Sequence, residues 1–252
     1  MTLSCRRDMA TVGEDVEAAV ARRELDREQR WYARYHTARW TELLALVDEL
    51  LARVRAQRPG EPPALLDVAI GMQTELLRAR VPGGRVDDLG FTDPVWESRP
   101  PSRHVDFDLN RAADESAWPR LGPYHLVVMS EVIEHLYVWP SAVLRMLRAA
   151  LVPGGFLVVQ TPNAVALHKR LRMLAGRPPV APIPEGRPGE PHLHEYTAAE
   201  LVEAGRAAGL EVEHVTGSNY FGFGRGARAY RALGRVLPLS LRHGLTVAFR
   251  AP

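Results

Sequence analysis

The sequence predicts an α/β fold in which a doubly wound, mostly parallel sheet of seven strands follows an amino-terminal helical cap. Residues 1–60, the cap, have a helical pattern almost without breakers. Across residues 61–252, short apolar runs alternate with helical segments, which implies right-handed crossovers and helices on both faces of the sheet. Tyr124–Ser130 (YHLVVMS) is apolar almost throughout, as expected of a strand buried on both faces.

The cap is predicted to run as helix from Glu14 to Gln57 and to stop at Arg58–Pro63 (RPGEPP). Apolar residues between Trp40 and Val54 recur at three- and four-residue spacings, which indicates a core-facing stripe. The more charged stretch Asp15–His36 is compatible with a separate helix. Its clustered aromatic residues either pack against the next helix or cover a site.

The sheet domain follows as a series of short elements, with two irregular segments at Gly176–Pro191 and Tyr220–Gly226. It ends in two strands without a final helix. The expected strands are Ala64–Ile70, Arg85–Leu89, His104–Phe107, Tyr124–Ser130, Gly155–Gln160, Leu210–Val215 and Gly244–Phe249, and the expected helices are Met72–Arg80, Ser141–Leu151 and Thr197–Ala208.

Composition places the chain among folded globular proteins, since 46% of its residues are hydrophobic and 25% are charged. The single cysteine, Cys5, cannot form an internal disulfide. The longest uncharged run, Ala149–His168, contains turn signals, so we expect no membrane span. The first residues carry charges and lack the apolar core of a signal peptide, which favours a cytoplasmic protein.

The basic residues do not predict a nucleic-acid partner. The formal net charge is only +2, and the arginines alternate with acidic residues along the chain. Lys169 is the one lysine; every other basic side chain, histidine aside, is arginine. Such a bias is typical of codon usage rather than of phosphate binding. The expected partner is a small molecule, and the sequence leaves both a monomer and a homodimer open.

Polar residues follow the ends of the first four predicted strands. Because the carboxyl ends of parallel strands meet at one edge of a sheet, these residues are expected to line a ligand crevice. They are Asp67 with the turn at Gly71, Asp87 and Asp88, Asp108 with Leu109, and the run Ser130–Leu136 (SEVIEHL).

From about Ala64 to its end, the chain resembles the class I S-adenosylmethionine-dependent methyltransferases. Two stretches are specific, SEVIEHL and Leu151–Asn163 (LVPGGFLVVQTPN). They resemble the motifs after the fourth strand and around the fifth strand in the branch with ubiquinone-pathway, sugar and natural-product O-methyltransferases. In that fold the last strand, Gly244–Phe249, is antiparallel.

The resemblance implies a cofactor site for S-adenosylmethionine. The family usually has glycine at the positions of Ala69 and Gln73, where the backbone passes close to the cofactor. Gln73 therefore implies either a loop that bends differently or a displaced cofactor. The residues implied are Asp67, Ala69 and Gly71 for the methionine part, Asp87 or Asp88 for the ribose, Asp108 and Leu109 for the adenine, with Ser130 and Glu131 beside them.

The leading hypothesis is methyl transfer to a hydroxyl of a small molecule, a sugar or natural product, which needs a base or a metal to deal with the hydroxyl proton. The candidate bases are His135, His192 and His194, each of which could instead be a packed or capping residue.

A helical turn after the fourth strand would project Glu131, Glu134 and His135 from one face. The small-RNA 2′-O-methyltransferases use a similar set, with a later histidine that matches His192, as metal ligands. Magnesium, manganese or zinc would suit these four residues. Alternatively, the glutamates orient the cofactor's amino group or cap the helix, and a histidine acts as a plain base.

Two other functions are alternatives for a chain with this pattern. A protein of this fold that has lost methyl transfer, and acts as a binding or partner subunit, would explain the changes at Ala69 and Gln73. A nicotinamide-dependent oxidoreductase is disfavoured because no Gly-x-Gly-x-x-Gly follows the first strand. Residues 164–193, with a helix at Ala164–Ala175, are predicted to form an insertion that either covers the acceptor site as a mobile lid or is rigid.

Overall fold

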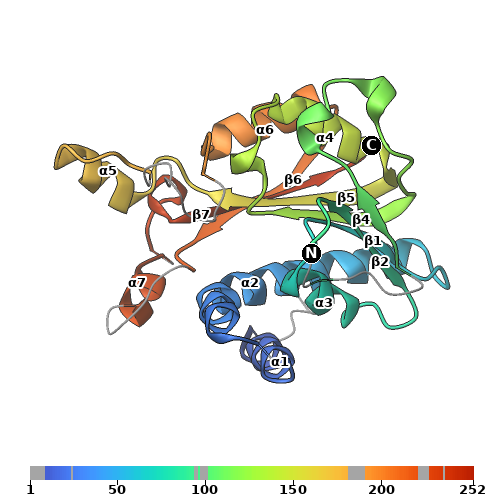
Figure 1. Cartoon of the computed structure of the whole chain (residues 1–252), viewed down its shortest axis with the longest axis horizontal. Helices are drawn as coiled ribbons and strands as arrows, with labels where there is room; N and C mark the ends of the chain where they lie inside the picture. Colours follow the sequence, from blue (N-terminus) through green and yellow to red (C-terminus); the bar gives the residue numbers. More distant parts are fainter. Residues whose placement is uncertain are drawn as a thin grey trace.

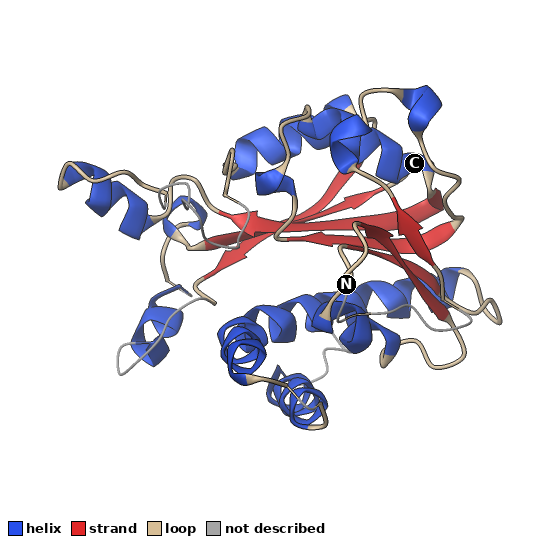
Figure 2. Cartoon of the chain, viewed as in Figure 1, coloured by secondary structure: helices blue, strands red, loops and turns tan. Residues whose placement is uncertain are grey.

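The computed structural model describes residues 9–23, 25–93, 96, 102–180, 191–220, 227–234 and 236–252. Its centre is one seven-stranded sheet in the order β3-β2-β1-β4-β5-β7-β6 (Figure 2). Only β7 runs antiparallel to its neighbours, which confirms the predicted fold class and the antiparallel last strand. The strands are β1 Ala64–Val68, β2 Arg85–Gly90, β3 His104–Asp106, β4 Tyr124–Ser130, β5 Leu151–Pro162, β6 Glu211–Ser218 and β7 Gly244–Arg250.

Helices cover both faces of the sheet. In Figure 1, α1, α2 and α3 lie along one face and α4 and α6 along the other, while α5 and α7 project at one end. Each face has its own apolar core, since alternate residues of the strands enter the two clusters. The helices are α1 Met9–Ala21, α2 Arg27–Gln57, α3 Met72–Arg78, α4 Pro140–Ala149, α5 Leu167–Leu174, α6 Ala198–Ala207 and α7 Ala227–Gly234.

The helical cap shares its core with the sheet. The predicted stripe from Trp40 to Val54 is buried and packs in one cluster with Leu65, Leu126 and Phe156 of the strands. The cap therefore forms one wall of the sheet domain.

The predicted helix boundary in the cap is wrong. The expected helix Glu14–Gln57 is interrupted between Ala21 and Arg27, and Asp15–His36 is not a separate helix, because α2 is continuous from Arg27. Its start is fixed by a capping box: Asp26 accepts from the Gln29 backbone N–H (2.8 Å), and the Gln29 side chain accepts from the Asp26 backbone N–H (3.0 Å). The aromatic residues stack within α2 itself, Trp31 on Tyr35 with ring centroids 5.4 Å apart.

Several element boundaries differ from the prediction. Strand β1 ends at Val68 because Ala69 has φ +72°, which no strand accommodates. Strand β5 extends further than predicted at both ends, and α7 between β6 and β7 was not predicted. Of the predicted irregular segments, residues 181–190 and 221–226 lie outside the described residues. Within the described ranges, no helix combines the length and the apolar character needed to span a membrane.

Candidate functional site

A cavity of about 420 Å³ lies at the carboxyl ends of β1 and β4, roofed by α2. Its size falls in the range typical of small-ligand sites. It is the crevice that the strand ends predicted. Its wall includes apolar and aromatic side chains from the cap, among them Tyr32 and Trp40, together with Trp96. The polar or backbone groups in the wall come from Arg39, Ala69, Gly71, Gln73, Asp93, Ser130 and Glu131.

The loop after β1 is organised around Asp67. This carboxylate is fully buried and accepts from Nε2 of Gln73 and from Oγ1 of Thr74, both at 2.7 Å. Thr74 in turn accepts from the Gly71 backbone N–H (3.0 Å). Gln73 therefore points toward Asp67 and stabilises the loop. The space beside Gly71 stays open, since no atom lies within 4 Å of where a Cβ would be.

Burial makes Asp67 hard to ionise. Desolvation raises its pKa to about 7, although the hydrogen bonds from Thr74 and Gln73 and the charge of Arg39 oppose that rise. Because its oxygens are occupied by Gln73 and Thr74, Asp67 shapes the cavity wall rather than lining the cavity.

Arg39 is a functional candidate that the sequence did not indicate. It is only 2% exposed, yet it forms one wall of the cavity. Its Nε donates to Nδ1 of His36 (3.0 Å), and Nη1 donates to the Ser130 hydroxyl and contacts Gln73 Oε1 at 3.4 Å. Burial and Arg39 lower the pKa of His36 to about 2, so its ring is neutral and accepts. A buried guanidinium beside a cavity suits an anionic ligand group such as a carboxylate.

Glu131 brings a carboxylate to the same cavity. It follows β4 with φ +57°, and its backbone N–H still donates to Gln160 O (2.9 Å). Its Oε1 is buried and has no hydrogen-bond partner among the described residues. Burial raises the pKa of Glu131, while Arg39 and Lys169 lower it. A buried carboxylate oxygen without a partner costs free energy, which a cationic ligand would offset.

A second group adjoins Glu131. Glu134, His135 and His192 each offer one ligand atom, and these atoms lie within 4.8 Å of one another. Glu134 is fully buried; its Oε2 accepts from Thr161 Oγ1 (3.0 Å), and its Oε1 has no partner in the part of the chain that is described. Burial and the neighbouring Glu131 raise the pKa of Glu134 to about 8. Glu131 is not in the group, because the turn after β4 is a 3₁₀ turn at Ile133–His135 and the three side chains do not share a face as predicted.

Both imidazoles of this group are held through Nδ1. His135 Nδ1 donates to Pro191 O (3.1 Å), and His192 Nδ1 donates to Glu195 Oε1 (2.9 Å). The rings meet edge to face with centroids 4.9 Å apart. Burial, His135 and Lys169 all lower the pKa of His192, so its ring is neutral at pH 7. A neutral ring that donates from Nδ1 keeps the Nε2 lone pair free to bind a metal or a proton.

The single lysine lies behind His192. Lys169, on α5, is 4% exposed; its ammonium contacts the other carboxylate oxygen of Glu195 and donates to Asn163 O (3.0 Å). Burial lowers the pKa of Lys169 to about 8, against the pull of Glu131 and Glu134. Lys169, Glu195 and His192 thus form a continuous chain of contacts that leads from α5 to the second group.

The comparisons with known proteins agree with this geometry. Residues 34–215 match the model of a methyltransferase domain family. The chain belongs to this family. This places it among the class I S-adenosylmethionine-dependent methyltransferases, as the sequence predicted.

Individual relatives are more distant. The methyltransferase is 30% identical over 122 residues to the ubiquinone biosynthesis O-methyltransferase of Thiobacillus denitrificans, a match that covers 47% of the chain and about half, 49%, of that relative. Its fold is similar to a chain from the Haloferax volcanii complex with the Trm112 methyltransferase activator (16% identity, TM-score 0.55, 94% of this chain and 98% of that one). A SAM dependent methyltransferase of Archaeoglobus fulgidus is similar in fold as well (14%, TM-score 0.50, 81% and 93%).

Four predicted cofactor residues besides Asp67 do not line the cavity. Asp87 is buried, accepting from Tyr124 Oη (2.8 Å) and the Arg103 backbone N–H (3.1 Å), and Asp88 is buried against His104 and Arg78. Asp108 caps the 3₁₀ turn Leu109–Arg111, and Leu109 is in the core. The acid of this region that reaches the cavity is Asp93.

One predicted base lies apart from the others. His194 is exposed, packs edge to face on Tyr196 and contacts Glu200 at 3.5 Å. It is not part of the group formed by Glu134, His135 and His192.

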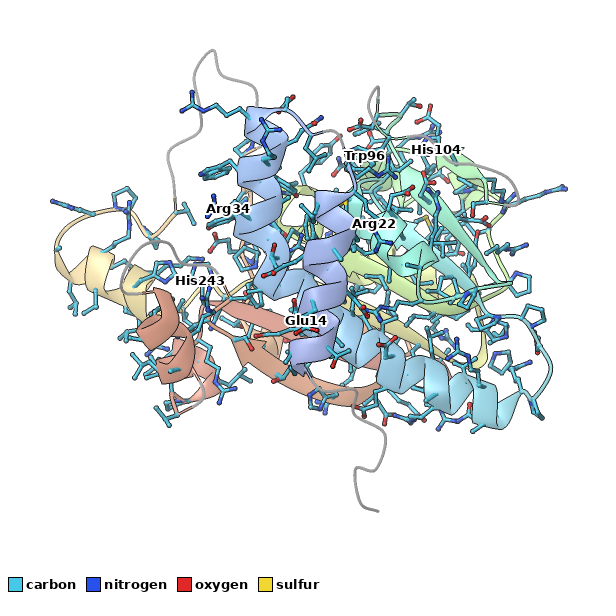
Figure 3. All side chains as sticks on the ribbon, turned by 90° about the horizontal axis from the view of Figure 1, so that it is seen from below. Glu14, Arg22, Arg34, Trp96, His104 and His243 are labelled. Carbon is cyan, nitrogen blue, oxygen red and sulfur yellow. The ribbon has the colours of Figure 1, made fainter. Side chains whose placement is uncertain are left out.

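His243, stacked on His168 with centroids 4.6 Å apart, lies at the α7 end of the molecule, whereas Trp96 lies beside the amino-terminal helices (Figure 3).

Proposed function

We propose that the chain transfers the methyl group of S-adenosylmethionine to a hydroxyl of a small-molecule acceptor, with the Glu134, His135 and His192 group at the acceptor hydroxyl. The observation that supports this most is the pairing of both Nδ1 atoms with oxygen acceptors, which leaves two imidazoles and a buried carboxylate facing one point. An acceptor hydroxyl needs such a group, because its proton must leave as the new bond forms.

The first cavity fits the cofactor. Arg39 offers a buried cation for the carboxylate of the methionine part, and the unpartnered Oε1 of Glu131 offers a buried anion for the amino or sulfonium charge. The open space at Gly71 lets the backbone approach the ligand. Asp93 is placed to accept from ribose hydroxyls in the role expected of Asp87 or Asp88.

In the proposed reaction, bound S-adenosylmethionine supplies the methyl group: its carbon–sulfur bond breaks with the electron pair left on sulfur, and a carbon–oxygen bond forms to the acceptor. His192 takes the hydroxyl proton at Nε2. Glu195 holds the ring in the required orientation and stabilises the imidazolium that results. The products are the methyl ether, S-adenosylhomocysteine and one proton, which His192 later returns to solvent.

Glu134, His135 and His192 also suit a divalent ion. One carboxylate and two imidazoles match the ligands of zinc or manganese better than the all-oxygen set that magnesium prefers. Metal-binding histidines characteristically donate their other ring N–H to a carboxylate or carbonyl, as His192 and His135 do. Such an ion would lower the pKa of the acceptor hydroxyl and fix its oxygen.

One set of measurements tests both forms of the proposal. Calorimetry with S-adenosylhomocysteine tests the cofactor site, with Arg39→Met expected to weaken binding at least about tenfold. Metal content and methyl transfer are then measured with and without chelator in wild type, in Glu134→Ala and in Glu115→Ala, a control at an exposed pair with Arg145.

Loss of turnover on chelation and of metal in Glu134→Ala alone supports the metal form. Full turnover in chelator leaves His192 as the base. Absence of S-adenosylhomocysteine binding in the wild type would contradict the proposal and favour a binding or partner subunit.

A further inference from the structure

A second cavity, of about 770 Å³, lies on the same face of the sheet, between α2 and the strands β6 and β7. Helix α7, which lies at the lower left of Figure 1, contributes part of its wall. The stripe of α2 that faces it carries Glu42, Leu46, Glu49 and Arg53, spaced three to four residues apart. The cavity is therefore built from the cap on one side and from the last strands of the sheet on the other.

A row of polar side chains joins the two cavities. Ser130, Gln160, Thr246 and Thr216 are register neighbours across β4, β5, β7 and β6. Ser130 Oγ donates to Gln160 Oε1 (2.9 Å), and Gln160 Nε2 donates to Thr246 Oγ1 (3.0 Å). Ser130 lines the first cavity, whereas Thr246 and Thr216 line the second.

This polar row is unlike the sheet beneath it. Two residues earlier on β4 and β5, and two later on β7, the same face carries Val128, Val158 and Ala248, all in the apolar core. A buried polar group costs free energy unless it is hydrogen-bonded, and Ser130, Gln160 and Thr246 are hydrogen-bonded to one another. The polar row thus borders the apolar core on this face of the sheet. Its Ser130 end lies at the first cavity, and its Thr246 and Thr216 end lies at the second.

Tyr220 is a buried residue next to the wall of the second cavity. It is fully buried directly after Asn219, which lines this cavity. Burial and the charges of Glu131 and Glu42 raise the pKa of its hydroxyl well above the usual value. Glu131 lines the first cavity and Glu42 lines the second, so the hydroxyl lies within the electrostatic influence of both cavity walls.

The wall of the second cavity is rich in hydrogen-bonding groups. Among the described residues, it contains no phenylalanine, tyrosine or tryptophan ring, unlike the first cavity with Tyr32, Trp40 and Trp96. An aromatic acceptor needs a largely apolar or aromatic wall, whereas the many hydroxyls of a sugar need a wall that supplies many hydrogen-bonding groups. The polar groups are Thr216, Ser218, Asn219 and Thr246, the acids Glu42, Glu49 and Glu213, and the basic residues Arg53, His214, Arg231 and Arg242.

We propose that this second cavity is the acceptor site and that it binds a hydroxyl-rich, non-aromatic molecule of the sugar or glycoside class. The proposal rests on the proposed function and extends it. The acceptor would lie along the polar row, with one hydroxyl at its Ser130 end, beside the first cavity, and its other hydroxyls bonded to β6 and α2.

The test uses the whole protein and two sets of probes. Methyl β-D-glucoside, methyl α-L-rhamnoside and glucosamine represent the hydroxyl-rich class, and catechol and 3,4-dihydroxybenzoate represent the aromatic class. Binding is followed by amide chemical shifts in the presence of S-adenosylhomocysteine. We expect at least one sugar probe, and neither phenol, to shift the amides of Thr216, Ser218 and Thr246. The double variant Thr216→Val, Ser218→Ala should weaken that binding about tenfold, and the control Thr92→Val should not.

S-adenosylhomocysteine affinity separates the possible failures. Because both substitutions lie on the outermost strand, away from the first cavity, the double variant should bind S-adenosylhomocysteine as the wild type does. Wild-type protein that binds S-adenosylhomocysteine but no sugar probe, or that binds the phenols at β6, overturns the acceptor assignment. Wild-type protein that does not bind S-adenosylhomocysteine contradicts the proposed function itself.

Discussion

Replacing Lys169 by methionine should destabilise the protein far more than an ordinary surface change. The ammonium and the Glu195 carboxylate are 5% and 6% exposed, so neither is well solvated. Removal of the ammonium leaves Glu195 buried with the neutral His192 as its one remaining donor among the described residues, and it frees the carbonyl of Asn163. Breaking one side of a buried ion pair costs about 3–5 kcal/mol, and the lost carbonyl bond adds about 1 kcal/mol.

Urea unfolding of wild type, Lys169→Met, Glu195→Gln and the double variant measures this cost as a cycle. The double variant should be clearly more stable than the sum of the two single changes predicts, because it no longer buries an uncompensated charge. Arg145→Met, at an exposed pair with Glu115, is the matched control and should change stability by less than about 1 kcal/mol. A cost for Lys169→Met as small as that of the control, or a strictly additive double variant, would refute the reasoning.

Four further outcomes are expected. Burial raises the pKa of Asp67 to about 7, so its contribution to stability is complete below about pH 4 and is lost toward pH 7, at up to about 1.4 kcal/mol per pH unit. In Asp67→Asn, the free energy of unfolding measured in urea should therefore depend less steeply on pH than in the wild type. Ala69→Gly relieves a left-handed φ of +72° and should raise the denaturation midpoint, for a gain of about 0.5–1 kcal/mol. Glu131→Gln should weaken calorimetric binding of cationic S-adenosylmethionine more than that of S-adenosylhomocysteine, which lacks the sulfonium charge. Gly205→Ala would place a Cβ 2.1 Å from the Phe249 ring and should cost about 1–3 kcal/mol in thermal unfolding.

The fold could be predicted from the sequence because its strands are local apolar runs between turn residues. Strand β4 and helices α4 and α6 lie where the pattern placed them to within two residues. The start of α2 was also encoded locally, in the capping box of Asp26 and Gln29, but the apolar pattern alone does not show it. Helix α7 is short and follows a glycine-rich stretch, so no periodic signal separates it from a loop.

The site was only partly readable because it depends on register and on long-range contacts. Asp88 pairs with Asp67 in the parallel register, so both lie inside the sheet, and the chain needs five more residues to bring Asp93 to the cavity. A sequence reveals that acids follow a strand but not how far each lies from the sheet edge. Arg39 lies 91 residues from Ser130 along the chain, and no local pattern predicts that contact. Lys169 was visible as the single lysine, yet its role requires α5 to fold back on Glu195.

The buried charges explain why one region can serve both a sulfonium and an acceptor hydroxyl. Arg39 and Lys169 compensate part of the negative charge of Glu131, Glu134 and Glu195, but Glu134, with a pKa of about 8, keeps its proton at pH 7. The region is therefore short of one cation. A cation that binds beside Glu131 or Glu134 replaces that proton, so binding and ionisation are linked and affinity should rise with pH toward 8. In the proposed function, the sulfonium would meet this need on the Glu131 side, and in its metal form a divalent ion would meet it on the Glu134 side. Under this proposal, Glu131 would bind the methyl donor and Glu134 would act at the acceptor hydroxyl, and the binding of a cation at either glutamate should depend on pH.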